Sequence, residues 1–510
     1  MYLKQDNDLP MPSSLSKPRS KSKSKMGFPA SSPRRLSFAI FVVLATFLAV
    51  AFFKPTRFGG CDVSFLSKAG VCLATVWNLF YHLGGNGPWI PRADGVAYSD
   101  ALLPEGCSVD QAHMLSRHAE RYPTRNAGAR HIELLERLQN PKVELKGPLS
   151  FLKSWEYFTD PADPSFENLT ATGPYAGTLQ AFNTGRTLRQ RYDHLIPQDR
   201  PTRIWSCGAS RDILTAEYFA SGFFGPDWLS QGTAELEVIP EDEGRGGDTL
   251  TPGDTCYEYV TDGEYGHDHG YQKLEEWQRV FTRPIAKRLS QHAQGLDFSY
   301  LDVFNMMEMC GFEILARGSS PWCNIFTHEE WSHFEYARDL LHFYRAGPGN
   351  AYAGVMGTLW LDATRNLMMN DSSKDVYFSF VHDGDIVPVL ATLQILNERD
   401  GAPKLPSHRI KADRRWKTSD VVPMGGRLIF ERIACDAKSK GGQGAYFVRL
   451  FINDGLVKFP ELPTVKNLKH AVRLKDFHDF IASRKELFGD FRQICNISEE
   501  APDRITFLHQ

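Results

Sequence analysis

From about residue 106 onward, short β-type runs alternate with amphipathic helical patterns, and this alternation limits the fold more than any other feature of the 510-residue chain. The run 202–206 leads into a helical pattern near 210–222. The run 376–381 leads into one near 386–396, where Pro388 would occupy the first turn. The runs 427–435 and 445–452 flank a Lys/Gly-rich loop, which predicts a hairpin. Interleaved strands and helices predict an α/β fold. The strand-like runs are 111–115, 202–206, 376–381, 427–435 and 445–452.

The rest of the chain divides by composition. Residues 270–365 have a helical pattern rich in Leu, Trp and Phe, which predicts a helical insertion in the α/β body. The ordinary share of apolar residues, 42%, excludes a wholly disordered or multi-span membrane chain, and the net charge of −3 gives no reason to expect a nucleic-acid partner. The expected organisation is a disordered basic tail (1–35), an apolar segment (36–53), an extended arm (54–105) and a catalytic body (106–510) with helical insertions roughly within 125–200 and 225–370.

The segment 36–53 contains eighteen residues without a charge and follows a tail with eight Lys or Arg and two Asp. At 1.5 Å per residue, this length is near the lower limit for crossing about 30 Å of hydrocarbon. The positive-inside rule keeps the tail cytosolic and places the rest in the lumen or outside the cell. We therefore expect a type II signal-anchor held in the lipid bilayer. Cleavage near Ala51, which would release a secreted protein, is the alternative.

All nine cysteines follow this segment, and none forms a CxxC pair. Cysteines confined to the non-cytosolic side indicate disulfides in an oxidising compartment, with at least one thiol left over. The glycosylation sequons at Asn168, Asn370 and Asn496 lie on the same side.

Three strand ends carry groups suited to a phosphate. The segment RHAERYPT (117–124) places His118 between Arg117 and Arg121, directly after the first run. Arg211 stands between the second run and its helix, and the pair His382-Asp383 follows the third. A planar guanidinium suits phosphate oxygens, a histidine serves as nucleophile or base, and ligands bind at the carboxyl ends of strands in open α/β sheets.

Each of these segments also has a purely structural interpretation. Residues 117–124 could form a solvated charged loop. Arg211 could be a surface arginine, and Asp383 could cap the following helix beside a His382 that is satisfied by its neighbours.

Taken together, the three segments resemble the histidine acid phosphatase family, the two-domain branch of the histidine phosphatases that includes fungal phytases and secreted fungal acid phosphatases. The likeness covers roughly residues 61–500 and includes TAEYF (215–219), CNIFTHEEW (323–331), YRAGPGN (344–350), FINDGLV (451–457) and CDVSFLSKAGVC (61–72). The resemblance implies a phosphoglycerate-mutase-like α/β sandwich with a smaller, mainly helical inserted domain.

The resemblance also implies roles for individual residues. His118 would attack phosphorus and form a phosphohistidine, and Asp383 would protonate the leaving group. The phosphoryl oxygens would be held by Arg117, Arg121, Arg211 and His382. Nearby guanidinium groups disfavour the imidazolium form and keep His118 neutral in acid. Because they also supply the positive charge, we expect no cofactor and no catalytic metal.

The family's disulfides imply the pairs Cys61–Cys72, Cys107–Cys435, Cys256–Cys495 and Cys310–Cys323, which leaves Cys207 as a small buried thiol. The sequence departs from the family at two positions. Ala119 replaces the glycine after the nucleophile, which we expect to crowd the phosphate loop by one methyl group. Trp205 stands where many fungal phytases have an additional arginine.

The resemblance implies an acid phosphatase that hydrolyses phosphate monoesters, with inositol phosphates among its possible substrates. Two alternatives remain open at this point. The first is a dedicated phytase, which would prefer a ring of Lys and Arg around its cleft. The second is a catalytically inactive, membrane-anchored binding protein, of which Ala119 would be the first sign.

Overall fold

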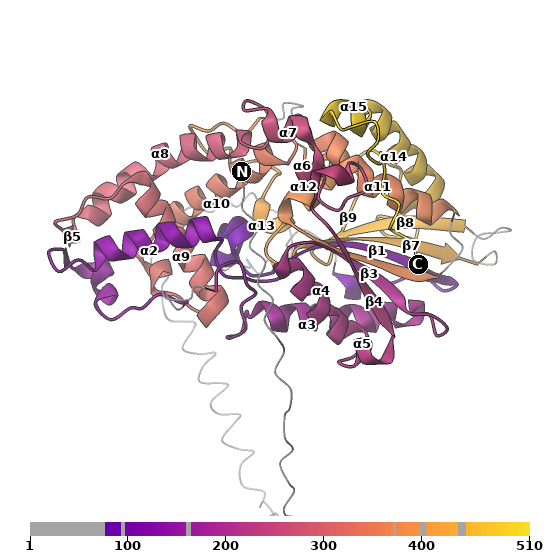
Figure 1. Cartoon of the computed structure of the whole chain (residues 1–510), viewed down its shortest axis with the longest axis horizontal. Helices are drawn as coiled ribbons and strands as arrows, with labels where there is room; N and C mark the ends of the chain where they lie inside the picture. The colour runs from indigo at the N-terminus through magenta and orange to yellow at the C-terminus, as the bar shows by residue number, and fades with distance from the viewer. Residues whose placement is uncertain (1–76, 93–96, 160–164, 371–373, 398–403, 437–444) are drawn as a thin grey trace, which may run out of the picture. The chain divides into compact units, whose positions relative to one another are not determined.

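A mixed eight-stranded sheet forms the centre of the structure, a computed structural model that describes residues 77–92, 97–159, 165–370, 374–397, 404–436 and 445–510 (Figure 1). Its strand order is β10-β8-β7-β1-β6-β3-β4, and β9 pairs with β8. Neighbours from β1 to β4 are parallel, whereas β7, β8, β9 and β10 pair antiparallel. The strands are β1 (Cys107–Arg117), β3 (Thr202–Cys207), β4 (Ala234–Ile239), β6 (Asp375–Val381), β7 (Arg427–Cys435), β8 (Ala445–Ile452), β9 (Gly455–Val457) and β10 (Val472–Arg473), and a separate two-stranded sheet pairs β2 (Glu144–Leu145) with β5 (Ala293–Gln294).

Helices cover both faces of the sheet, and a group of long helices extends beside it (Figure 1). This arrangement confirms the predicted α/β fold with a helical part. In chain order the helices are α2 (Arg125–Leu138), α3 (Gly177–Tyr192), α4 (Ser210–Phe223), α5 (Trp228–Gln231), α6 (Pro252–Thr255), α7 (Tyr257–Thr261), α8 (His269–Ser290), α9 (Tyr300–Arg317), α10 (His328–Arg345), α11 (Ala353–Asn370), α12 (Asp383–Thr392), α13 (Thr418–Val421), α14 (Leu474–Phe488) and α15 (Phe491–Cys495).

The central strand β6 is buried on both faces, as a near-continuous apolar sequence predicts for a parallel strand. Successive side chains alternate between faces. Val376, Phe378 and Phe380 belong to the cluster formed with α3 and α4. Tyr377 and Val381 belong to the larger cluster, which includes residues of α11, α12 and α14. Full burial of each such side chain contributes about 1.5–3 kcal/mol, so this strand anchors both layers.

The helical part consists mainly of α2, α8, α9 and α10. Capping boxes begin two of these helices: Ser299 with Asp302 starts α9, and Thr327 with Glu330 starts α10. The ranges 125–200 and 225–370, within which the sequence predicts the insertions, also contain α3 and α11. Helix α3 packs on α4, and α11 packs on α12 and α14.

Helix α12 differs from the sequence-based prediction at both ends. It begins at Asp383, directly after β6, and ends at Thr392, so Pro388 lies in its interior and not in its first turn. Asp385 accepts the backbone N–H of His382 at 3.0 Å and caps the helix three residues earlier than the apolar periodicity indicates. The early start places His382 and Asp383 at the junction of strand and helix.

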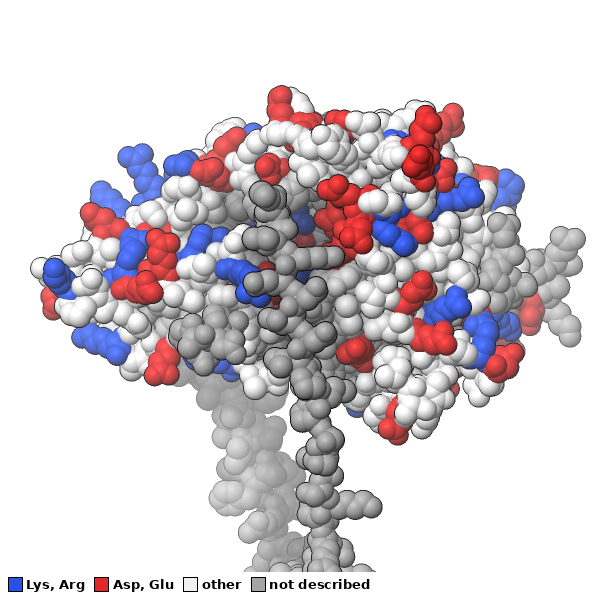
Figure 2. Space-filling model, in the orientation of Figure 1, with Lys and Arg blue, Asp and Glu red and all other residues white. Residues whose placement is uncertain are grey.

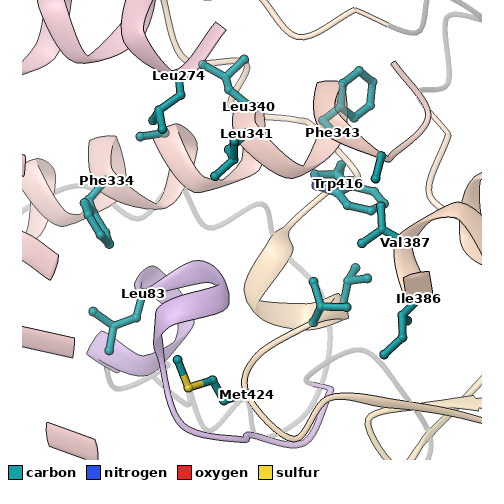
Figure 3. Packing of buried hydrophobic residues seen from close by; sticks show 14 of the residues in the cluster. Leu83, Leu274, Phe334, Leu340, Leu341, Phe343, Ile386, Val387, Trp416 and Met424 are labelled. Atoms are coloured by element: carbon teal, nitrogen blue, oxygen red, sulfur yellow. The ribbon is translucent and has the colours of Figure 1, made fainter. Parts of the chain in front are cut away.

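The described part of the predicted arm contains short 3-10 turns. The turns η1 (Leu79–His82) and η2 (Gly84–Asn86) pack against α10 and α13. Leu83 is fully buried in the main core cluster, which also contains Met424 and residues of α10 and α12 (Figure 3). Gly84 has φ +57°, and a Cβ there would meet Arg338 at 2.4 Å, so this turn requires glycine.

Three disulfides join described cysteines, in the same pairs that the resemblance implies. Cys207 is free and buried, while Cys61 and Cys72 lie outside the described residues. Residues 76–510 form one compact unit. Within its described part, no helix is both long and apolar enough to cross a bilayer, and the segment 36–53 falls outside it. The bonded pairs are Cys107–Cys435, Cys256–Cys495 and Cys310–Cys323.

Candidate active site

Three adjacent parallel strands end at one edge of the sheet. β1 ends at Arg117, β6 at Val381 and β3 at Cys207, and β6 lies between the other two. All six residues assigned to the candidate site line a single cleft of about 670 Å³ at this edge. They are Arg117, His118, Arg121, Arg211, His382 and Asp383.

The ring of His118 is fixed by a hydrogen bond to its own loop. Its Nδ1 lies 2.9 Å from the carbonyl oxygen of Ala119, so Nδ1 carries the proton and donates it there. Nε2 therefore carries no proton and keeps the lone pair that a nucleophile needs. Arg121 directs its Nε–H to this nitrogen at 3.3 Å. An incoming phosphoryl group would meet both groups together.

Two effects keep the His118 ring neutral. Burial disfavours the imidazolium form, since only 2% of the residue is exposed. The guanidinium groups of Arg117, Arg121 and Arg211 add to this effect, and the pKa of His118 lies well below its usual value. The nucleophile is therefore unprotonated in acid, where a free histidine would be charged.

Asp383 faces the nucleophile loop from the first position of α12. Its Oδ2 pairs with Arg117 Nη2 at 2.8 Å and its Oδ1 with Arg345 Nη2 at 3.2 Å. Burial opposes the charged form of Asp383, but the two arginines outweigh it and hold the pKa of this carboxyl well below its usual range. In the free protein Asp383 is therefore a carboxylate.

Arg117 is itself held firmly by the backbone. Its Nη1 donates to the carbonyl oxygens of Gly85 and Val422 at 2.8 and 2.7 Å. The turn η2 and the segment after α13 thus orient the guanidinium group toward Asp383. A fixed donor costs little reorganisation when a phosphate arrives.

His382 lies between two carboxylates. Its Nδ1 is 3.1 Å from Asp212 Oδ2, and its Nε2 is 3.3 Å from Glu241 Oε1. Burial disfavours a charged ring, but Asp212 outweighs it and the pKa of His382 lies well above its usual value. Arg211 Nη2 lies 3.2 Å from the same Nδ1. Together, His382 and Arg211 present positive charge to the cleft.

The expectation that Ala119 crowds the phosphate loop is wrong. Its side chain packs with Leu169 and Ala181 in a small apolar cluster and does not line the cleft. Its N–H donates to Thr215 Oγ1 at 2.9 Å, which ties the loop to α4. Across the loop, Gly177 approaches the backbone of Glu120 so closely that a Cβ would lie 1.9 Å from its oxygen.

Trp205 is also remote from the cleft. It is fully buried in β3, and its Nε1–H donates to Glu237 Oε2 at 3.0 Å. Trp205 therefore does not supply to the cleft the additional arginine that many fungal phytases have at this position.

Several cleft residues are not identified by the strand-end pattern. Arg345 and Arg338 come from α10 and Arg130 from α2, so each reaches the cleft from a helix of the inserted part. The segment YRAGPGN contained the only signal for any of them, because it places Arg345 in a family-like stretch. Glu241, which contacts His382 but does not line the cleft, follows β4 and has no motif around it.

Glu120, the acid nearest in sequence to His118, points away from the cleft. It is fully buried, and its Oε1 accepts the backbone N–H of Trp89 at 2.9 Å. Burial raises the pKa of Glu120 to about 7. Its position fits a structural link between the nucleophile loop and the segment 77–92, not proton transfer to a substrate.

Comparison with known proteins agrees with this geometry. Residues 108–453 match the histidine phosphatase superfamily (branch 2). The chain is 32% identical to an acid phosphatase of Komagataella pastoris over 83% of this chain and 88% of that one, and 32% identical to a phytase of Candida albicans over 84% and 90%. The crystal structure of the phytase from D. castellii superposes with a TM-score of 0.75 at 28% identity, covering 84% of this chain and 90% of that one. The chain belongs to the histidine phosphatase superfamily, branch 2.

Proposed function

We propose that the protein is an acid phosphatase that hydrolyses phosphate monoesters through a phosphohistidine. The observation that carries this proposal is a neutral His118 whose Nε2 faces an arginine-lined cleft, with Asp383 at the neighbouring strand end. Phosphoryl transfer needs a positioned nucleophile and stabilisation of the phosphoryl oxygens, and little other covalent machinery. An inactive binding protein is less well supported, because every charged group of this mechanism lines the cleft and Ala119 leaves it unobstructed.

In the first step, His118 Nε2 forms a bond to phosphorus while the bond between phosphorus and the ester oxygen breaks. Arg117, Arg121 and Arg211 hold the phosphoryl oxygens. Asp383 gives a proton to the leaving alkoxide. In the second step, water attacks the phosphohistidine, passes a proton to Asp383 and releases phosphate and neutral His118.

The proton on Asp383 comes with the substrate, because Arg117 and Arg345 hold the pKa of this carboxyl well below its usual range in the free protein. Below about pH 6 a phosphate monoester itself carries a proton, which can pass to Asp383 within the cleft. Above that pH both the ester and Asp383 are ionised. Activity therefore declines as pH rises, while neutral His118 sustains it in acid.

The cleft favours a broad monoesterase over a dedicated phytase. Six arginines line it, but Glu308 contacts Arg130 at 3.2 Å and Arg338 at 3.7 Å and neutralises part of that charge. Burial raises the pKa of Glu308, but His131 and the two arginines lower it to about 2, so the carboxylate persists in acid. Acidic and basic side chains are also interspersed over the face shown in Figure 2.

We expect kcat/KM for an aryl phosphate and for sugar phosphates to equal or exceed that for phytate at acidic pH. Steady-state assays of the purified protein on the three substrates measure this ratio. Glu308→Gln should raise the relative efficiency on phytate, because it leaves Arg130 and Arg338 unneutralised. Wild-type efficiency on phytate about 10-fold above the other substrates would indicate a dedicated phytase instead.

We further propose that residues 36–53 anchor the protein as a single-pass type II membrane protein of the secretory pathway or cell surface, with a cytosolic tail. The supporting observations are the uncharged segment, the basic tail and the disulfides between cysteines on its far side. Cys61–Cys72 would be a further disulfide. Asn168 and Asn496 are exposed on the described surface and, with Asn370, are proposed glycosylation sites.

Protease treatment of intact vesicles should leave the catalytic body protected and remove only the tail. Carbonate extraction should leave the protein in the membrane pellet. A soluble enzyme whose sequence starts near Phe52 would show cleavage after Ala51 and would contradict anchoring.

A further inference from the structure

Behind His382, away from the proposed phosphate position, lies a group of side chains that the proposed mechanism does not use. Cys207 is the last residue of β3, Asp212 lies in the first turn of α4, and Glu241 follows β4. The ligand atoms of Cys207, Asp212 and His382 all lie within 4.8 Å of one another. Adjacent strands of the sheet thus bring a thiol, an imidazole and carboxylates together.

Two separations within this group match those between the ligands of a tetrahedral metal ion. His382 Nε2 lies 3.6 Å from Cys207 Sγ and 3.3 Å from Glu241 Oε1. Around a tetrahedral zinc ion, bond lengths of about 2.3 Å to sulfur and about 2.0 Å to nitrogen and oxygen place N and S about 3.5 Å apart, and N and O about 3.3 Å apart. The two separations from Nε2 are therefore those that a cation shared with Cys207 and Glu241 would require.

Asp212 contacts His382 on the ring nitrogen that would not bind the metal. Its Oδ2 lies 3.1 Å from the other ring nitrogen of His382, Nδ1. The carboxylate is fully buried, and neither of its oxygens makes a well-aligned hydrogen bond to any described residue. A carboxylate on the far nitrogen of a metal-binding histidine fixes the ring and strengthens its basicity.

The site is reachable from the catalytic cleft. His382 lines the cleft, and its side chain and that of Glu241 are 18% and 29% exposed. Cys207 is buried and would form the inner side of the metal site. The three ligands leave a fourth position for water, and the sulfur and nitrogen donors select zinc-like cations over Mg²⁺ and Ca²⁺.

We propose that Cys207, His382 and Glu241 form a binding site for a borderline or soft divalent cation such as Zn²⁺, and that its occupation inhibits the enzyme. Binding replaces the proton on His382 Nε2 and the thiol proton of Cys207, and both protons pass to solvent. The metal then holds the ring that the family resemblance assigns to the phosphoryl oxygens. The inhibitory part of this proposal rests on the proposed phosphatase function, whereas the binding site does not.

Co²⁺ titration of the full-length protein in detergent tests the site without substrate. The wild type should bind one Co²⁺ with a thiolate-to-metal charge-transfer absorption, and Zn²⁺ should displace it. Cys207→Ser should lack this absorption and bind at least about 10-fold more weakly. His267→Ala, at an exposed His–Asp pair, serves as the matched control and should bind as the wild type does. Absence of the absorption in the wild type would overturn the proposal.

Inhibition is measured with an aryl phosphate, which chelates metal less than phytate does. Cys207→Ser should keep the basal activity, since Cys207 has no role in the mechanism, and should need at least about 10-fold more Zn²⁺ for half-inhibition. Equal inhibition of the two proteins would overturn the regulatory part. Cys207-dependent Co²⁺ binding in a protein without phosphatase activity would uphold the site and contradict the proposed function instead.

Discussion

His118→Ala is expected to abolish the phosphoenzyme and to lower kcat by on the order of 10⁴-fold or more. The variant removes the only described histidine whose Nε2 faces the cleft with its Nδ1 proton bound to a backbone carbonyl. Arg117, Arg121 and Arg211 remain, so the cleft should still bind inorganic phosphate. Binding without turnover would separate loss of the nucleophile from loss of the site.

Rapid quench with labelled substrate measures the intermediate directly. The wild type should yield an acid-labile, alkali-stable labelled protein, as a phosphoramidate bond predicts. His478→Ala, a partly exposed histidine on α14 that does not line the cleft, is the matched control and should label normally. Labelling of His118→Ala at the wild-type level would mean that another residue accepts the phosphoryl group.

The sequence predicts the residues at the catalytic edge of the sheet because each of them lies in a short local motif. Each strand end places polar residues after a buried apolar run, and parallel strands must end at the same edge once they are adjacent. The chain order of the strands does not reveal that β6 lies between β1 and β3, yet any neighbouring arrangement would bring Arg117, Arg211 and His382 together.

Other features depend on tertiary packing, which leaves no local pattern. Arg130 and Arg338 reach the cleft from α2 and α10, and no sequence motif marks either residue. Replacement of the family glycine by Ala119 predicts a phosphate loop crowded by one methyl group, whereas this methyl packs with Leu169 and Ala181 and does not line the cleft. Glu241 becomes notable only through its contact with His382, 141 residues away.

Replacing Asp383 by asparagine is expected to slow hydrolysis of alkyl phosphates by about 100- to 10,000-fold, the usual contribution of a general acid. An alkoxide leaves poorly without a proton, whereas an activated phenol leaves as a stable anion. Esters of such phenols should therefore lose less than about 10-fold. Asparagine keeps the shape of the side chain, and phosphate can replace the lost charge beside Arg117 and Arg345.

The pH profile gives a second, independent measure of Asp383. Arg117 and Arg345 hold its pKa low in the free enzyme, and the bound phosphate's negative charge raises it. Since kcat/KM reports the free enzyme and substrate and kcat the complex, the alkaline limb of kcat/KM should follow the ionisation of the ester at about pH 6, whereas that of kcat should follow the proton on Asp383 in the complex. Asp383→Asn should remove the alkaline limb of kcat, while Glu275→Gln, at another acid lining the cleft, should preserve it. In the comparison of leaving groups, equal losses of Asp383→Asn on alkyl and activated aryl esters would instead assign Asp383 to the positioning of Arg117. A positioning defect weakens phosphate binding whatever the leaving group.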